Sequence, residues 1–137
     1  MNIGRIALAT LGGFVAYFAS GSAMFFLLPQ MMEEGRKYAT LFRPREEMMA
    51  RMPGLMVGTL VSILVTVVLY AMGFRGGFGL AEGACFGALI GVFVVSAFVV
   101  HNYVNLSFGP KLMLMQAGAY FVEWTVVGAA IGLIYRG

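Results

Sequence analysis

The chain has one cysteine, one histidine and few charged residues, and each scarcity excludes a class of protein. Cys85 alone cannot form a disulfide within the chain or a zinc site of the multi-cysteine type. His101 alone cannot provide both axial ligands of a bis-histidine haem, and no Cys-x-x-Cys-His motif occurs. Charged residues make up 11% of the 137 residues and hydrophobic residues 61%. Such a chain lacks the polar residues that cover a water-soluble domain.

Motifs for catalysis and for nucleic-acid binding are also missing. The sequence has no His-Glu-x-x-His, no glycine-rich phosphate loop and no Ser, His and acid arrangement in a known motif context. The isoelectric point is near 9.3, but the nine lysines and arginines are scattered among apolar runs and form no stripe for a phosphate backbone. We therefore predict that the protein is not an enzyme and does not bind nucleic acid.

What the sequence does contain is long apolar runs, which raise the mean hydropathy to +0.89. The four longest runs nearly free of charge cover residues 6–28, 54–74, 83–106 and 112–135. About 20 helical residues cross the roughly 30 Å hydrocarbon core of a bilayer. Only a helix satisfies the backbone of such a run inside lipid. The sequence thus predicts an all-α, multi-pass four-helix bundle, with residues 1–137 forming a single transmembrane domain.

The remaining polar segment of any size is the loop 29–53, which holds nine of the fifteen charged residues. Pro44, followed by Arg45, Glu46 and Glu47, is typical of a helix start with acids in the first turn. Pro53 is predicted to begin the second span. We expect a short interfacial helix between the two prolines. The other connections are short, so neighbouring helices should be antiparallel.

Small residues recur at helical spacing in three of the spans, a pattern that lets helix backbones approach closely. These helix-packing residues are Ala9, Gly12 and Ala16 in the first span, Gly83, Gly87 and Gly91 in the third, and Gly128 and Gly132 in the fourth. Packing within the chain and contact with another subunit both explain the stripes. Four helices offer more small faces than one compact bundle must use.

Glu123 is the acidic residue inside a span, close to the centre of the bilayer. An ionised carboxylate there costs several kcal/mol unless it is paired or faces water, so Glu123 is the first candidate for function. Helical spacing places Gln116 and Tyr120 on the same face. The third and fourth spans are joined by a turn around Gly109 and should be antiparallel. A residue of one span therefore lies at the same depth in the bilayer as the residue of the other span that is equally far from Gly109.

These depths predict a polar intramembrane cluster. Its members are Glu123, Tyr120, Gln116, His101, Asn105 and Ser96. Interhelical hydrogen bonds, a path for a solute or proton, and a haem or chlorophyll held by His101 are the open interpretations of this cluster. We predict no resident metal or cofactor.

Two glycine-containing segments carry a resemblance to a known group of proteins. Gly-Ala-Cys-Phe-Gly-Ala at 83–88 and Val-Gly-Ala-Ala-Ile-Gly at 127–132, together with the charged first loop, resemble uncharacterised bacterial small membrane proteins that are grouped as a domain of unknown function. The resemblance implies a four-helix fold in the bacterial inner, or cytoplasmic, membrane. It implies no activity and no site.

The leading hypothesis from the sequence is a non-catalytic membrane protein that works by helix association. It would be an accessory subunit of a larger complex or an oligomer, with the bilayer and other membrane subunits or its own copies as partners. The glycine stripes and the methionine-rich first loop would be the contact surfaces. A small solute or proton carrier centred on Glu123 is the first alternative, and a haem- or chlorophyll-binding subunit using His101 is the second.

Overall fold

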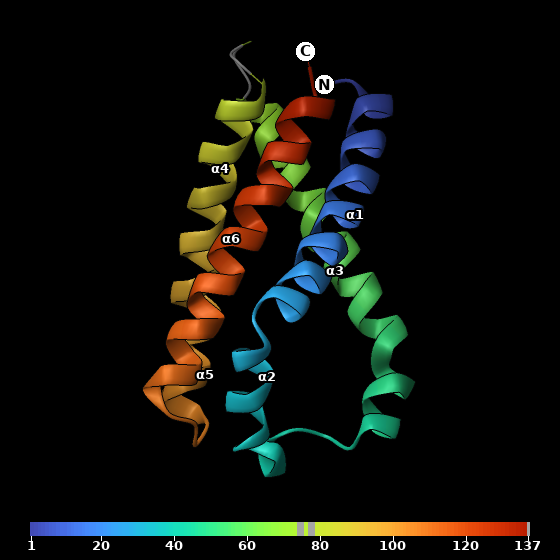
Figure 1. Cartoon of the computed structure of the whole chain (residues 1–137). Helices are drawn as coiled ribbons and strands as arrows, with labels where there is room; N and C mark the ends of the chain where they lie inside the picture. Colours follow the sequence, from blue (N-terminus) through green and yellow to red (C-terminus); the bar gives the residue numbers. More distant parts are fainter. Residues whose placement is uncertain (74–75, 77–78, 137) are drawn as a thin grey trace.

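The chain folds into a bundle of long helices. The computed structural model describes residues 1–73, 76 and 79–136, and the regular elements among these residues are all helical. The long elements are α1 (Ile3–Leu27), α3 (Arg45–Gly73), α4 (Gly79–Val94) continuing into α5 (Val100–Asn105), and α6 (Pro110–Ile134). Each is long and apolar enough to cross a bilayer. Figure 1 shows both chain ends at the same end of the bundle. The predicted all-α, multi-pass membrane bundle is confirmed.

The second span begins earlier than predicted. α3 starts at Arg45 and continues through Pro53, which therefore lies inside the helix. The prediction that Pro53 begins this span was wrong, because a proline removes a single backbone hydrogen bond and neighbouring water or side chains can satisfy the freed carbonyl. Pro53 and both residues that follow it are exposed. The predicted end of the span at Phe74 lies outside the described residues.

A short helix of the first loop is present, but it precedes Pro44. α2 (Pro29–Arg36) follows α1 after one residue, Leu28, whose φ of −124° and ψ of 67° are not helical. A residue before proline is disfavoured in the α conformation, and Pro29 is suited to the first position of a new helix. A short 3-10 turn, η1 (Ala39–Leu41), completes the loop. The break at Leu28 lets α2 take its own direction.

The glycine stripes of the third and fourth spans pack against each other. Gly83, Gly87 and Gly91 of α4 are buried, as are Gly128 and Gly132 of α6. A Cβ atom built on Gly87 would lie 2.8 Å from the Cα atom of Gly128, and one on Gly83 would lie 2.7 Å from that of Gly132. The two backbones are therefore in direct contact, as small residues allow. These glycines serve packing within one chain.

The stripe of α1 faces the remaining helices. Ala9 is fully buried, Gly12 lies against the side chain of Ile134, and Ala16 packs at the edge of the core. The buried hydrophobic core consists of Ala9, Ile63, Val67, Tyr70, Trp124, Val127, Ile131 and Tyr135. These residues belong to the half of the bundle that carries the chain ends. That half is closely packed.

The opposite half of the bundle is looser. Figure 1 shows the N-terminal half of α3 leaning away from α1 and α2. Residues 43–58 are exposed apart from Met52, which is half-buried. The first burial on α3 is at Thr59. The fold therefore leaves the α2 end of the bundle open beside α3.

Candidate functional site

A cavity of about 450 Å³ lies in this looser half, between α1, α2 and the first half of α6. Its volume is in the range of small-molecule sites in proteins. The lining residues are Tyr17, Phe18, Gly21, Ser22, Met24 and Phe25 from α1, Met31, Met32 and Gly35 from α2, Phe42 from the loop, and Leu112, Gln116, Ala119, Tyr120 and Glu123 from α6. Three helical elements thus build one site.

Glu123 forms the inner end of the cavity. Its surface is only 8% exposed, although it lines the cavity. Gly21 of α1 faces it so closely that a Cβ atom there would lie 2.8 Å from Oε1 of Glu123. Within the described part of the chain, no ion pair and no hydrogen bond reaches this carboxyl group. A buried acid without a described cation is expensive in lipid, so Glu123 is the first candidate for a functional residue of this cavity.

Two phenols accompany the carboxyl group. Tyr17 from α1 and Tyr120 from α6 lie close enough to Glu123 to interact with it electrostatically. Ring contacts hold both phenols in place, because Tyr17 packs against Trp124 at 5.8 Å and Tyr120 against Phe98 at 5.8 Å between ring centroids. The inner end of the cavity therefore combines one carboxyl group with two positioned hydroxyl groups.

The structure divides the predicted polar cluster. Gln116, Tyr120 and Glu123 follow one face of α6 and all line the cavity. His101, Asn105 and Ser96 are exposed and do not line it. The Asn105 amide instead donates a hydrogen bond to the His101 carbonyl oxygen of its own helix, at 2.9 Å. The prediction that these three residues join Glu123 is corrected.

The place of the cavity explains the correction, because α1, α2, the loop after α2 and α6 line it. No described residue of α4, of α5 or of the π-helical turn η2 (Val95–Val99) between them lines it. Val99 is fully buried, while His101 points outward. A haem or chlorophyll bound through His101 would therefore lie on the outer surface of the bundle and not in the cavity.

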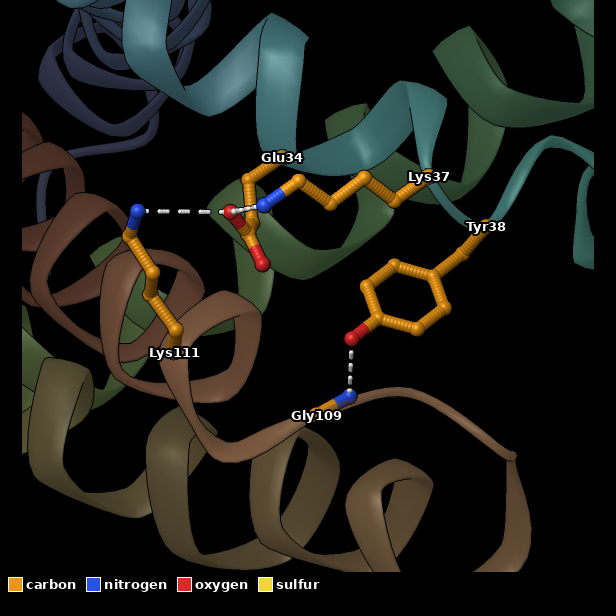
Figure 2. Close-up of polar contacts among 5 residues, drawn as sticks. All are labelled: Glu34, Lys37, Tyr38, Gly109 and Lys111. Carbon is orange, nitrogen blue, oxygen red and sulfur yellow. Dashed lines mark hydrogen bonds and ion pairs between the residues drawn. The ribbon is translucent and has the colours of Figure 1, made fainter.

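The α2 end of the cavity is tied to α6 by a polar contact that we call the α2 latch, formed by Glu34, Lys37, Tyr38, Gly109 and Lys111 (Figure 2). Oε2 of Glu34 lies 2.9 Å from the amine of Lys37 and 3.4 Å from the amine of Lys111. The Gly109 N–H donates a hydrogen bond to the Tyr38 hydroxyl, at 2.9 Å. The latch connects a helix that lines the cavity to the first turn of α6.

The latch is expected to depend on pH in a defined direction. The hydrogen bond from Lys37 is the main reason why the pKa of Glu34 lies below its ordinary value, and Lys111 lowers this pKa further. The same hydrogen bond raises the pKa of Lys37. The contact therefore stabilises the folded chain above the ordinary pKa of a glutamate and is lost as the pH falls through the lowered one. It is also lost when the pH rises through the raised pKa of Lys37.

Hydrogen exchange of the α2 amides tests this prediction. In the wild type, the exchange rate, after correction for the intrinsic effect of pH on exchange, should rise as the pH falls through the acidic range. Glu34→Gln should exchange rapidly at neutral pH and lose the acid dependence, because the neutral amide cannot pair with two lysines. Glu33→Gln, one position away and exposed, is the matched control. Equal protection of α2 in all three proteins would show that the latch does not hold the helix.

Sequence reasoning missed the contributions of α1 and α2 to the site. Gly21 and Ser22 lie within a stretch of small and polar residues in the last third of an otherwise apolar span, and this interruption was the available signal. The contribution of α2 had no such signal, because its position depends on the break at Leu28 and on the latch. No group of three or more His, Cys, Asp or Glu side chains among the described residues is arranged to hold a metal ion.

The fold and the cavity together define a class, a multi-pass membrane protein with a mainly apolar cavity that contains one carboxyl group. Comparison of the chain with protein-family models, with curated proteins and with solved structures gives no match. The function is therefore inferred from the site itself.

Proposed function

We propose that the protein is a small non-catalytic carrier that binds a solute, or a proton, at Glu123 inside the membrane. The observation that supports this proposal is the buried Glu123 carboxyl group, which faces a cavity of about 450 Å³ and has no cation beside it in the part of the chain that the structure describes. Ionisable groups inside membrane proteins are rare and mark substrate and proton pathways. Here the carboxyl group exchanges a proton for the bound solute.

The position of the cavity suggests how the solute enters. The cavity extends along α6 from Leu112 to Glu123, which are 11 residues or about 17 Å apart. Beyond Glu123, towards the chain ends, the core is closed by fully buried Val127, Ile131 and Ile63. On the other side, α2 and its latch cover the cavity. We propose that α2 is the gate on the side of the membrane where it covers the cavity, and that repacking of the buried core opens the cavity to the opposite side. A carrier that works by alternating access opens its site to one side of the membrane at a time.

Flux in reconstituted vesicles tests the carrier proposal. In vesicles with an imposed proton gradient, wild-type protein should let protons flow down the gradient or should move solute in exchange for those protons. Glu123→Gln should reduce this flux to the level of empty vesicles. The substitution keeps the shape of the side chain and removes its charge and exchangeable proton. Glu46→Gln, at an exposed glutamate outside the cavity, is the matched control. Undiminished flux through Glu123→Gln would contradict the proposal.

Association with a partner is the second candidate function. The glycine stripes of α4 and α6 no longer support it, because they are occupied within the chain. The exposed N-terminal half of α3 supports it, since Met48, Met49 and Met56 are at least 43% exposed there. Methionine is common on adaptable contact surfaces. The preparation used for reconstitution separates the two ideas, because a clean monomer that retains flux supports the carrier, whereas a defined complex without flux supports the accessory subunit.

The location follows from the same reasoning. Four apolar helices place the protein in a bilayer. The resemblance noted above leads us to propose the bacterial cytoplasmic membrane, where a proton gradient is available to a carrier.

A further inference from the structure

We propose that the ligand of this cavity is a hydrophobic organic monocation, such as an aryl phosphonium or a bulky quaternary amine. This inference names a substrate class for the proposed carrier and rests on that proposal. The juxtaposition that carries it is one buried carboxyl group at the end of a cavity whose remaining wall is mainly aromatic, aliphatic and thioether, with Gln116 and a few hydroxyl groups as its other polar groups.

The charge pattern of the lining selects the sign of the ligand. Glu123 contributes a negative charge, and among the described residues no lysine, arginine or histidine lines the cavity. An anion would be desolvated against the carboxylate with no counter-charge, which is strongly unfavourable in a low dielectric. A cation supplies the counter-charge that Glu123 lacks in the described structure. The lysines of the α2 latch do not supply it, because both are committed to Glu34.

The aromatic wall selects the character of the cation. Side chains of Tyr17, Phe18, Phe25, Phe42 and Tyr120 line the cavity from α1, the loop and α6. Aromatic faces attract cations and also cover apolar surface, and desolvation strengthens this attraction. A small inorganic cation would need oxygen ligands, and the lining offers few of them beyond Glu123, Gln116 and hydroxyl groups. A cation with an apolar body fits both features.

The methionines add tolerance of shape. Met24, Met31 and Met32 line the cavity from α1 and α2. Thioether side chains are flexible and contact aromatic rings favourably, so they adapt to ligands of different outline. The site is therefore expected to accept several hydrophobic cations of similar size and not one unique compound.

Two ions of the same shape and opposite charge provide the test. Binding of tetraphenylphosphonium and of tetraphenylborate is measured by equilibrium dialysis on the full chain in neutral detergent, with protein-free micelles as the blank. Wild-type protein should bind the phosphonium at one site and the borate at least tenfold more weakly. Glu123→Gln should weaken phosphonium binding about tenfold or more. Glu123→Asp, which keeps the charge, should retain most of it, and Glu46→Gln should bind as the wild type does.

The outcomes separate this inference from the proposal beneath it. Equal binding of both ions, or phosphonium binding unchanged in Glu123→Gln, would overturn the cation assignment. Absence of phosphonium binding together with a Glu123-dependent proton flux in vesicles would overturn the ligand class and leave the carrier in place. Absence of both binding and flux would overturn both. If Glu123→Gln does not fold, phosphonium binding by Glu123→Asp, set against the borate control, still decides the assignment.

Discussion

Gly128→Val is expected to separate α4 from α6 and to lower the free energy of unfolding by about 3 kcal/mol or more. A Cβ atom at Gly128 would lie in contact with the Gly83 carbonyl oxygen and 2.6 Å from the Gly87 nitrogen. These neighbours are backbone atoms of a helix, so they cannot move aside as a flexible side chain would. The two helices must instead move apart along the whole stripe.

Thermal unfolding in a fixed detergent measures this effect, with Gly118→Ala as the matched control on the same helix. No atom of the described residues lies within 4 Å of a Cβ atom built at Gly118. Replacing a glycine by alanine in an open helical position is neutral or stabilising, by up to about 1 kcal/mol. The Gly128 variant should therefore lose stability while the Gly118 variant keeps or gains it. Similar stability of both variants would mean that the α4 and α6 backbones are not in direct contact.

Gly21→Val is expected to abolish the function of the site and to leave the bundle folded. A Cβ atom at Gly21 would lie 2.8 Å from Oε1 of Glu123, and the larger valine side chain would fill the space in front of the carboxyl group. The clash is with the end of a side chain beside a cavity, so it can be relieved by moving the carboxyl group. Stability should change by less than about 1.5 kcal/mol, whereas flux should fall to the level of Glu123→Gln.

Flux in vesicles and thermal unfolding on the same preparations test this expectation. Gly21→Ala should show a partial loss of flux, since it adds only the first carbon atom. Gly54→Ala on α3, where a Cβ atom would have no neighbour within 4 Å in the described part of the chain, should behave as the wild type. Full flux through Gly21→Val would show that the space between α1 and Glu123 is not part of the path.

Gly128→Val, which tests stability, and Gly21→Val, which tests flux, lie in different halves of the bundle. The half near the chain ends is held by glycine contacts between α4 and α6 and by a buried core. The other half holds the cavity, the exposed start of α3 and the α2 latch. Regions that move during function are drawn from the less stable parts of a structure. A rigid half and an adjustable half are consistent with the proposed carrier and its proposed gate at α2.

Hydropathy and residue spacing alone determined much of this fold. The length of the four apolar runs requires helices in lipid, because no other backbone arrangement satisfies its hydrogen bonds there. The glycine repeats identified the packing faces of the third and fourth spans, because close approach needs residues without side chains. Glu123 stood out as an acid inside a span, and regular helical spacing linked it to Gln116 and Tyr120 on α6.

Tertiary structure alone decided what surrounds Glu123. The cavity formed between α1, α2 and α6, so His101 in the third span lies exposed outside it, and no local sequence signal fixes which helices enclose a cavity. The break at Leu28 and the Glu34 contact with Lys111 brought α2 over the cavity, and that contact joins residues 77 positions apart in the chain. Local propensity and periodicity specify helices and their faces, whereas the enclosure of a site depends on contacts between distant segments, which only the folded chain brings together.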